Sequence, residues 1–183
     1  MKRFLLLITF LGMVSCTCFR SSSPVNEIKS PEVSSPEINS DTFIEIKMEG
    51  GGFYGGVNPV SENIKLIKSD GTVVIHSKQL YTGGKEKTFS VPRAKIEEMA
   101  RLIIDQGFFQ MKELYDCDQS NQQCQDRKIK YPPAVPLKID VTIGQLRKQV
   151  TVTVCEKGMV EYPDGFELIA NRIDELTNQE KLK

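Results

Sequence analysis

A strict alternation of apolar and polar side chains in the C-terminal half constrains the fold of this chain most. Every second residue from Leu137 to Ile143 is apolar, and the same period returns from Val150 to Val154. This period is typical of a β-strand that buries one face. Residues 144–147 separate the two segments by a short turn that contains a glycine. The sequence therefore predicts a β-hairpin in this region.

Three or four more strands are predicted in the N-terminal half. Residues 43–48 alternate apolar and charged side chains, and residues 86–90 form a further short candidate strand. The apolar-rich runs 62–68 and 72–76 flank the dipeptide Asp70-Gly71. Because Asp-Gly between two such runs is a strong signal for a tight turn, these runs are predicted to form a second hairpin.

Two amphipathic helices complete the predicted domain. Residues 92–106 and 164–176 both carry apolar side chains at helical spacing, and Gly107 suits the end of the first helix. The apolar stripes consist of Ile96, Met99, Ala100 and Ile103 in the first helix, and of Phe166, Ile169, Ala170, Ile173 and Leu176 in the second. This order of elements predicts an α+β fold, in which an antiparallel β-sheet of about five to six strands has both helices packed on one face.

The N-terminus has the layout of an export signal. Basic residues at positions 2 and 3 precede an almost wholly apolar stretch over residues 4–14, and Ser15-Cys16 follows. The segment Met13-Val14-Ser15-Cys16 resembles the lipobox of bacterial lipoproteins, although leucine is commoner than methionine at its first position. The resemblance implies that Cys16 receives a lipid, with fatty acyl chains such as palmitate, and becomes the mature N-terminus. An ordinary signal peptide, cut near Ser15, is the alternative.

The predicted organisation has three parts. Residues 1–15 form the signal peptide, residues 16–41 the lipidated N-terminus and a Ser/Pro-rich tether, and residues 42–178 a single α+β domain. The anchor implies that the domain lies at the cell envelope on the extracytoplasmic side of a membrane, and both inner and outer membranes fit the pattern.

The cysteines agree with an oxidising compartment. Cys117 and Cys124 lie in a polar stretch, residues 116–126, which reads as a surface loop. A disulfide across this loop is expected to stabilise the fold by roughly 2–3 kcal/mol. Cys155 ends the last alternating stretch and is expected to be a buried, unreactive thiol. Thiol chemistry at Cys155 is the exception to an otherwise non-catalytic prediction.

No residue pattern in the chain predicts a metal site, a cofactor or an active site. His76 is the one histidine, so a zinc site of the usual composition has too few ligands. Asp116, Asp118 and Ser120 have the spacing of the first ligands in a calcium loop, but Arg127 stands where a bidentate glutamate belongs. The glycines over residues 50–55 satisfy a dinucleotide-binding spacing, yet a strand rather than a helix is predicted after them.

Charge balance also limits the kinds of partner. The 183 residues include 24 basic and 24 acidic side chains, and the formal net charge is zero. Proteins that bind nucleic acid through charge are usually basic. We therefore expect no nucleic-acid partner, and we expect contact with the membrane through the N-terminal lipid rather than through a charged surface.

Several short motifs, in order, resemble those of emfourin-type domains, which are small bacterial inhibitors of thermolysin-like metallopeptidases, and of related uncharacterised bacterial lipoprotein domains. The motifs are a first strand that runs into a glycine-rich turn, the Asp70-Gly71 hairpin, a helix that ends in Gly107-Phe108-Phe109, a strand pair and a closing helix. The resemblance implies that the turn contacts a peptidase. The contact residues would be Gly51, Gly52, Phe53, Tyr54, Gly55 and Gly56.

An alternative for this turn is that its aromatic residues cap the core while its glycines serve only the turn geometry. The sequence as a whole predicts a membrane-anchored lipoprotein that acts as a non-catalytic binding module and not as an enzyme. An envelope protein or a peptidase is its expected partner, and a protease inhibitor is one form that such a module takes. A structural or assembly lipoprotein of the cell envelope is the alternative function.

Overall fold

A computed structural model describes residues 38–51, 60–79, 81–130, 134–154 and 158–178, all of which belong to one compact unit that spans Ser35–Lys183. The signal peptide and most of the tether lie outside the described residues. The elements, in chain order, are β1 (Ile44–Gly50), β2 (Val60–Lys68), β3 (Thr72–Gln79), β4 (Gly83–Ser90), α1 (Arg93–Asp105), the 3₁₀ turn η1 (Phe108–Gln110), β5 (Leu114–Tyr115), α2 (Gln122–Ile129), β6 (Leu137–Ile143), β7 (Leu146–Val152) and α3 (Asp164–Asn178).

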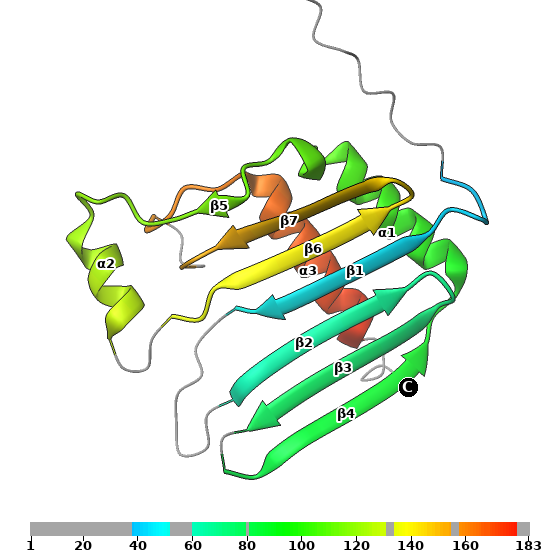
Figure 1. Ribbon diagram of the computed structural model, residues 1–183, viewed down its shortest axis with the longest axis horizontal. Helices are drawn as coiled ribbons and strands as arrows, with labels where there is room; N and C mark the ends of the chain where they lie inside the picture. The colour runs from blue at the N-terminus through cyan, green and yellow to red at the C-terminus, as the bar shows by residue number, and fades with distance from the viewer. Residues whose placement is uncertain (1–37, 52–59, 80, 131–133, 155–157, 179–183) are drawn as a thin grey trace, which may run out of the picture. The chain divides into compact units, whose positions relative to one another are not determined.

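The strands form one seven-stranded sheet in the order β4-β3-β2-β1-β6-β7-β5 (Figure 1). The prediction of an α+β fold is confirmed, but the predicted strand number and pairing were wrong in detail. The sheet is mixed because β5 pairs with β7 in parallel, through Leu114 opposite Thr151 and Tyr115 opposite Val152. A strand of two residues is too short to produce an alternating pattern, so β5 could not be predicted from the hydrophobic period.

Both predicted hairpins are present. The turn between β2 and β3 is fixed by Asp70, whose side chain accepts a hydrogen bond of 2.8 Å from the backbone N–H of Thr72. This bond is the local reason that aspartate favours such turns, and it lowers the pKa of Asp70 because it stabilises the carboxylate. The hairpin of β6 and β7 has the short turn that the glycine at position 144 predicted.

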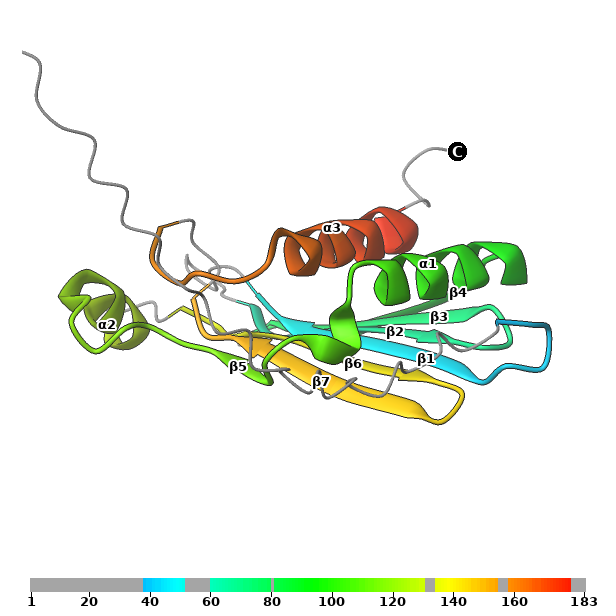
Figure 2. The ribbon, with the colours of Figure 1, turned by 90° about the horizontal axis from the view of Figure 1, so that it is seen from above.

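Helices α1 and α3 lie on one face of the sheet, as predicted (Figure 2). Their apolar stripes pack against the alternate residues of the central strands, which include Ile44 and Ile46 in β1 and Ile139 and Val141 in β6. All four of these isoleucine and valine side chains are fully buried. The core therefore lies between the sheet and this two-helix layer.

The cysteine-containing stretch departs from its prediction, because part of the expected surface loop is the helix α2. This helix lies at one end of the sheet, apart from the two-helix layer (Figures 1 and 2). Asn121 begins it by accepting a hydrogen bond of 3.0 Å from the backbone N–H of Cys124. Cys124 is the one buried residue among its eight, so no apolar stripe marked the helix in the sequence.

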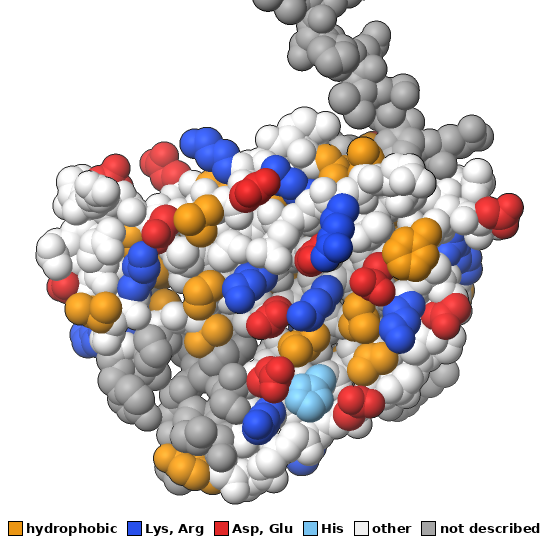
Figure 3. Space-filling model, in the orientation of Figure 1, with side chains coloured by type: hydrophobic (Ala, Val, Ile, Leu, Met, Phe, Trp, Pro, Cys, Tyr) orange, Lys and Arg blue, Asp and Glu red, His pale blue; other side chains and the backbone are white. Residues whose placement is uncertain are grey.

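The other face of the sheet is not covered by helices, and Figure 3 shows it directly. Charged side chains from neighbouring strand positions pair on this face, such as Lys47 with Glu49 at 3.0 Å and Arg147 with Asp140 at 3.2 Å. On the same face, side chains of β2 and β3 form a half-buried apolar strip, which consists of Ile64, Leu66 and Val74. This side of the sheet is therefore a mixed polar surface and not a second core face.

Arg93 fastens the beginning of the folded domain to its first helix. The guanidinium donates hydrogen bonds to the backbone oxygens of Ser69 and Thr42, both at 2.7 Å, and to that of Asn39 at 3.2 Å. It also donates to Glu97 one turn along α1 at 3.1 Å. One side chain thus joins the β2–β3 turn, the chain entering β1, and α1.

We expect Arg93→Ala to lower the free energy of unfolding by about 2 kcal/mol, since the hydrogen bonds of a charged group to several carbonyls are lost. Chemical denaturation of the full chain, followed by circular dichroism, measures this. The matched control is Arg101→Ala, which removes a 57% exposed arginine from the same helix; among the described residues this arginine forms one ion pair, of 3.6 Å, with Glu97. A control variant as unstable as Arg93→Ala would contradict the role assigned to Arg93.

Candidate partner-binding site

The glycine-rich turn begins where β1 comes very close to the chain that enters β6. Gly50 has a φ of +86° and Gly51 a φ of +80°, and the N–H of Gly51 donates to the backbone oxygen of Pro136 at 3.2 Å. A Cβ atom on Gly50 would lie 2.0 Å from that same oxygen. Glycine is therefore required at position 50 both for its backbone conformation and for the space.

Of the six residues predicted to contact a partner, the structure describes only Gly51. Gly52, Phe53, Tyr54, Gly55 and Gly56 lie outside the described residues. Gly51 lies at the edge of a recess between the ends of β1 and β2, the start of β6, and α3. We call this recess the β1 groove.

The β1 groove has a volume of about 340 Å³, which is at the lower end of the range for ligand pockets and suits one side chain or a small ligand. Its apolar lining is supplied by Met48, Leu137, Tyr162, Phe166 and Ala170. Tyr162 packs edge-to-face on Phe166, with ring centroids 5.8 Å apart. These contacts give the recess a packed apolar floor and an aromatic wall.

The polar lining of the β1 groove consists of Asn63, Lys65, Glu167, Asn171 and Asp174. Lys65, whose side chain is only 12% exposed, donates to Oδ1 of Asp174 and so links β2 to α3. In the described part of the chain, the side-chain amides of Asn63 and Asn171 form no hydrogen bond with another protein group. The groove therefore combines an apolar floor with polar groups that are available to a ligand.

Sequence reasoning did not find this site beyond its first glycine. Lys65 and Asp174 are 109 positions apart, and each looks like an ordinary surface charge in the sequence. Phe166 and Ala170 were predicted as core residues of the last helix, and both are indeed buried. The groove arises because the start of α3 leaves the ends of β1 and β2 uncovered, which no local pattern reports.

A second recess, of about 510 Å³, lies between α1 and α3. Its charged residues largely bond to one another, since Arg172 donates to Glu98 at 3.0 Å across the two helices and to Glu175 at 2.8 Å. The bond to Glu175 is the main cause that raises the pKa of Arg172. Although this recess is larger, its ion pairs account for most of its polar lining, so the β1 groove is the better candidate site.

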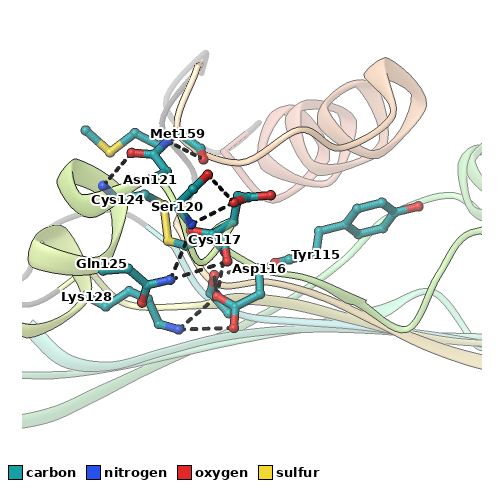
Figure 4. Close-up of a disulfide and its surroundings, with 11 residues drawn as sticks. Tyr115, Asp116, Cys117, Ser120, Asn121, Cys124, Gln125, Lys128 and Met159 are labelled. Atoms are coloured by element: carbon teal, nitrogen blue, oxygen red, sulfur yellow. Dashed lines mark hydrogen bonds and ion pairs between the residues drawn. A yellow bond between two sulfur atoms is a disulfide. The ribbon is translucent and has the colours of Figure 1, made fainter.

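The predicted disulfide is present. Cys117 and Cys124 are bonded, with their Cα atoms 5.6 Å apart, and Figure 4 shows how the surrounding polar groups hold the bridged segment. The side chain of Gln125 donates to the backbone oxygen of Asp118 at 3.2 Å. Lys128 and Thr153 donate to Asp116 at 2.9 and 2.6 Å, which ties α2 to the chain that follows β7. The bridge and these bonds together fix α2 at the end of the sheet.

The carboxylates of this segment do not converge as calcium ligands would. Asp118 accepts hydrogen bonds from the N–H and the hydroxyl of Ser120, at 2.8 and 2.5 Å, whereas Asp116 faces Lys128. Within the described ranges, no group of three or more His, Cys, Asp or Glu side chains is arranged to hold a metal ion. The Asp-rich spacing is therefore accounted for by local turn and salt-bridge bonds.

His76 lies on β3 at the uncovered face of the sheet. Its Nε2 is 3.6 Å from Glu62, and its Nδ1 is 3.9 Å from Glu86. The two glutamates come from the strands on either side, β2 and β4, at positions that the register brings close to His76. The histidine thus lies between two acidic side chains on this face.

Asp116 supplies a prediction for the dependence of stability on pH. Its hydrogen bond with Lys128, followed by that with Thr153, lowers its pKa. The stability that Asp116 contributes is therefore present above the unfolded-state pKa of about 3.9 and is lost as the pH falls through the lowered folded-state pKa.

We expect Asp116→Asn to reduce the unfolding free energy at pH 7 by less than about 1 kcal/mol, because the carboxylate is partly exposed. The difference from the natural chain should shrink as the pH falls below about 4. Denaturation curves over this pH range measure it. Glu161→Gln, an exposed acidic residue, is the control, and a difference that stays constant with pH would contradict the prediction.

Two further cysteines with predicted roles, Cys16 and Cys155, lie outside the described residues, and so does Cys18. Among the helices that are described, none combines the length and apolar character needed to cross a membrane. The chain matches no protein-family model, and a comparison with curated proteins finds no match. The resemblance to emfourin-type domains therefore stays a prediction, and the site is characterised by its own geometry.

Proposed function

We propose that this chain is a bacterial lipoprotein of the cell envelope, anchored through a lipid on Cys16, whose extracytoplasmic domain is a non-catalytic module that binds a protein. A thermolysin-like metallopeptidase is the first partner to test, since the resemblance of the glycine-rich turn implies this class. The observation that carries the proposal is the β1 groove. It adjoins the turn that the resemblance assigns to partner contact, and it has an apolar floor and unbonded amides.

The disulfide supports the proposed location. Disulfides persist in oxidising compartments outside the cytoplasm, and the Cys117–Cys124 bridge closes a short segment beside a buried Cys124 side chain. An exported chain with a lipobox-like start would form this bridge after translocation. The location outside the cytoplasm is therefore supported by two separate features of the chain, the disulfide and the lipobox-like start.

Metabolic labelling tests the anchor. The full chain is expressed in a bacterium with labelled palmitate, beside the variants Cys16→Ser and Cys18→Ser. We expect the label and the membrane association in the natural chain and in Cys18→Ser, and their loss in Cys16→Ser. A label that persists in Cys16→Ser, or that is absent from every form, would refute the proposed anchor.

Peptidase assays test the binding role. The purified full chain, in detergent, is added at micromolar concentration to a thermolysin-like peptidase and its substrate. Slower hydrolysis is expected, with less slowing by a variant that fills the β1 groove, such as Ala170→Leu. Unchanged hydrolysis would remove the peptidase from the proposal.

The alternative, a structural or assembly lipoprotein of the envelope, is supported by the uncovered sheet face. Ile64, Leu66 and Val74 form a half-buried apolar strip there, surrounded by paired charges. This strip would be covered by the surface of a second envelope protein, whereas the β1 groove accommodates one side chain of a partner. Crosslinking from Val74 in intact cells distinguishes the two roles, because a crosslinked product at this position favours the assembly role.

A further inference from the structure

We propose that the β1 groove receives an arginine side chain from the partner protein. This inference rests on the proposed function and specifies the chemistry of its partner. The observations that lead to it are the unbonded carboxylate oxygen of Asp174, the distribution of hydrogen-bond acceptors, and the apolar floor.

The charges of the groove favour a cation. Its ionisable lining consists of one basic residue, Lys65, and two acidic residues, Glu167 and Asp174. Lys65 is already compensated, because its ammonium contacts Oδ1 of Asp174. The second oxygen of Asp174 has no hydrogen-bond partner in the described part of the chain, and this side chain is 49% exposed. This oxygen can accept hydrogen bonds from a cationic donor, whereas a carboxylate would be repelled by Asp174 and would find Lys65 already paired.

The positions of the acceptors favour arginine over lysine. Oδ2 of Asp174 and the amide oxygens of Asn63 and Asn171 belong to separate elements, β2 and α3, that face each other across the groove. A guanidinium carries five donors in one plane and binds several acceptors at once, whereas an ammonium acts as a compact point charge. The spread of acceptors across two elements matches the planar group.

The floor of the groove suits the rest of the arginine side chain. Arginine buries its aliphatic stem along apolar surface while its charged end stays with polar groups. Met48 and Phe166 supply a floor that is at most 5% exposed, and Tyr162 lies against Phe166 at the wall. A guanidinium beside a tyrosine ring gains further attraction from the ring face.

Nuclear magnetic resonance with short peptides tests the inference on the full chain in detergent micelles. The probes are acetyl-Gly-Xaa-Gly-amide peptides in which Xaa is arginine, citrulline, lysine or norleucine. Citrulline keeps the shape of arginine but removes its charge. We expect the arginine peptide to shift the backbone amide signals of Gly51, Asn63 and Asn171 with a Kd of about 1 mM, and the other peptides to bind at least about tenfold more weakly.

Variants assign the binding to the groove. Asn171→Ala removes an exposed amide without disturbing the ion pair of Lys65, and it should weaken the arginine peptide about threefold or more. Asp174→Asn should weaken it about tenfold. Asp105→Asn makes the same change of charge at an exposed position of the neighbouring recess and should leave the Kd unchanged. Spectra of the free variants that match the natural chain outside the groove show that each is folded.

Equal binding of the lysine, citrulline or norleucine peptide would overturn the inference, and so would signals that move outside the groove or do not move at all. An arginine Kd that rises equally in Asp105→Asn and Asp174→Asn would do the same, since it would indicate general attraction to acidic surface. None of these outcomes changes the result expected from palmitate labelling or from the peptidase assay. Failure of the inference is therefore separable from failure of the proposed function.

Discussion

The variant Gly50→Ala is expected to have a free energy of unfolding about 2–5 kcal/mol lower than that of the natural chain. A left-handed backbone at an alanine costs about 1–2 kcal/mol, and the φ of Gly50 is +86°. A clash adds about 1–3 kcal/mol, because the new Cβ would lie 2.0 Å from the backbone oxygen of Pro136. Urea denaturation of the full chain, followed by circular dichroism, measures the change.

Gly83→Ala is the matched control for this prediction. Gly83 has nearly the same φ, +82°, but a Cβ there would meet no atom within 4 Å. Its variant should lose only about 1–2 kcal/mol, the cost of the left-handed conformation alone. If the two variants lose the same stability, the close approach of β1 to Pro136 is not a constraint on the fold.

The comparison also bears on the two explanations for the glycine-rich turn. At Gly50 the requirement is geometric and independent of any partner, because the obstructing atom belongs to the backbone of Pro136. At Gly51, which is the first residue predicted to contact a partner, the nearest obstruction is the Cδ1 atom of Leu137 at 3.1 Å. The side chain of Leu137 lines the β1 groove and can move by rotation. Turn geometry thus explains the need for glycine more completely at Gly50 than at Gly51.

The elements that the sequence predicted are those with a strong period. In β1 and β6 three alternate residues of each strand are buried, such as Ile46 opposite Val141. In α1 the buried residues are those of the predicted stripe, and in α3 they are those of the predicted stripe together with Thr177. Here burial on one face leaves a regular pattern, because side chains alternate along a strand and recur every three or four residues along a helix.

The elements that the sequence missed lack such a pattern. β4 is longer than predicted because Gly83, Gly84 and Lys85 are exposed edge residues, which are paired with β3 through the backbone alone. α2 depends on the capping Asn121 and on the bridge to Cys117, neither of which creates an apolar stripe. These elements are specified by local hydrogen bonds and by a covalent bond, and a pattern of hydrophobicity does not record either.

The candidate site was less predictable than the fold for a related reason. The glycine-rich turn pointed to one edge of the β1 groove, but the opposite wall comes from α3, far along the chain. Asn63 and Asp174 stand at ordinary polar positions of a strand and a helix. Their significance comes from the register of β1 with β2 and from the placement of α3 over that end of the sheet. A single sequence carries no signal for such a long-range meeting of polar residues.

Phe108→Ala is expected to lower the free energy of unfolding by about 3–5 kcal/mol, the usual cost of removing a buried phenylalanine. Phe108 is fully buried and follows Gly107, whose left-handed conformation (φ of +66°) ends the helical segment and starts the 3₁₀ turn η1. The turn contacts both α1 and β7, so the ring fills space between the helix layer and the sheet. Thermal and chemical unfolding, followed by near-ultraviolet circular dichroism, measure the loss.

Phe109→Ala tests whether the stability loss expected for Phe108→Ala comes from the burial of Phe108 or from the contact between the two aromatic rings. The rings of Phe108 and Phe109 meet edge-to-face with centroids 5.9 Å apart, so either substitution removes this contact, which is worth about 0.5–1.5 kcal/mol. Phe109 is only partly buried, and its loss leaves a smaller cavity. The Phe109 variant should therefore lose less than half as much stability as the Phe108 variant. Equal losses would mean that the pair acts through its mutual contact, and that Phe108 does not serve as the core residue that joins α1 to the sheet.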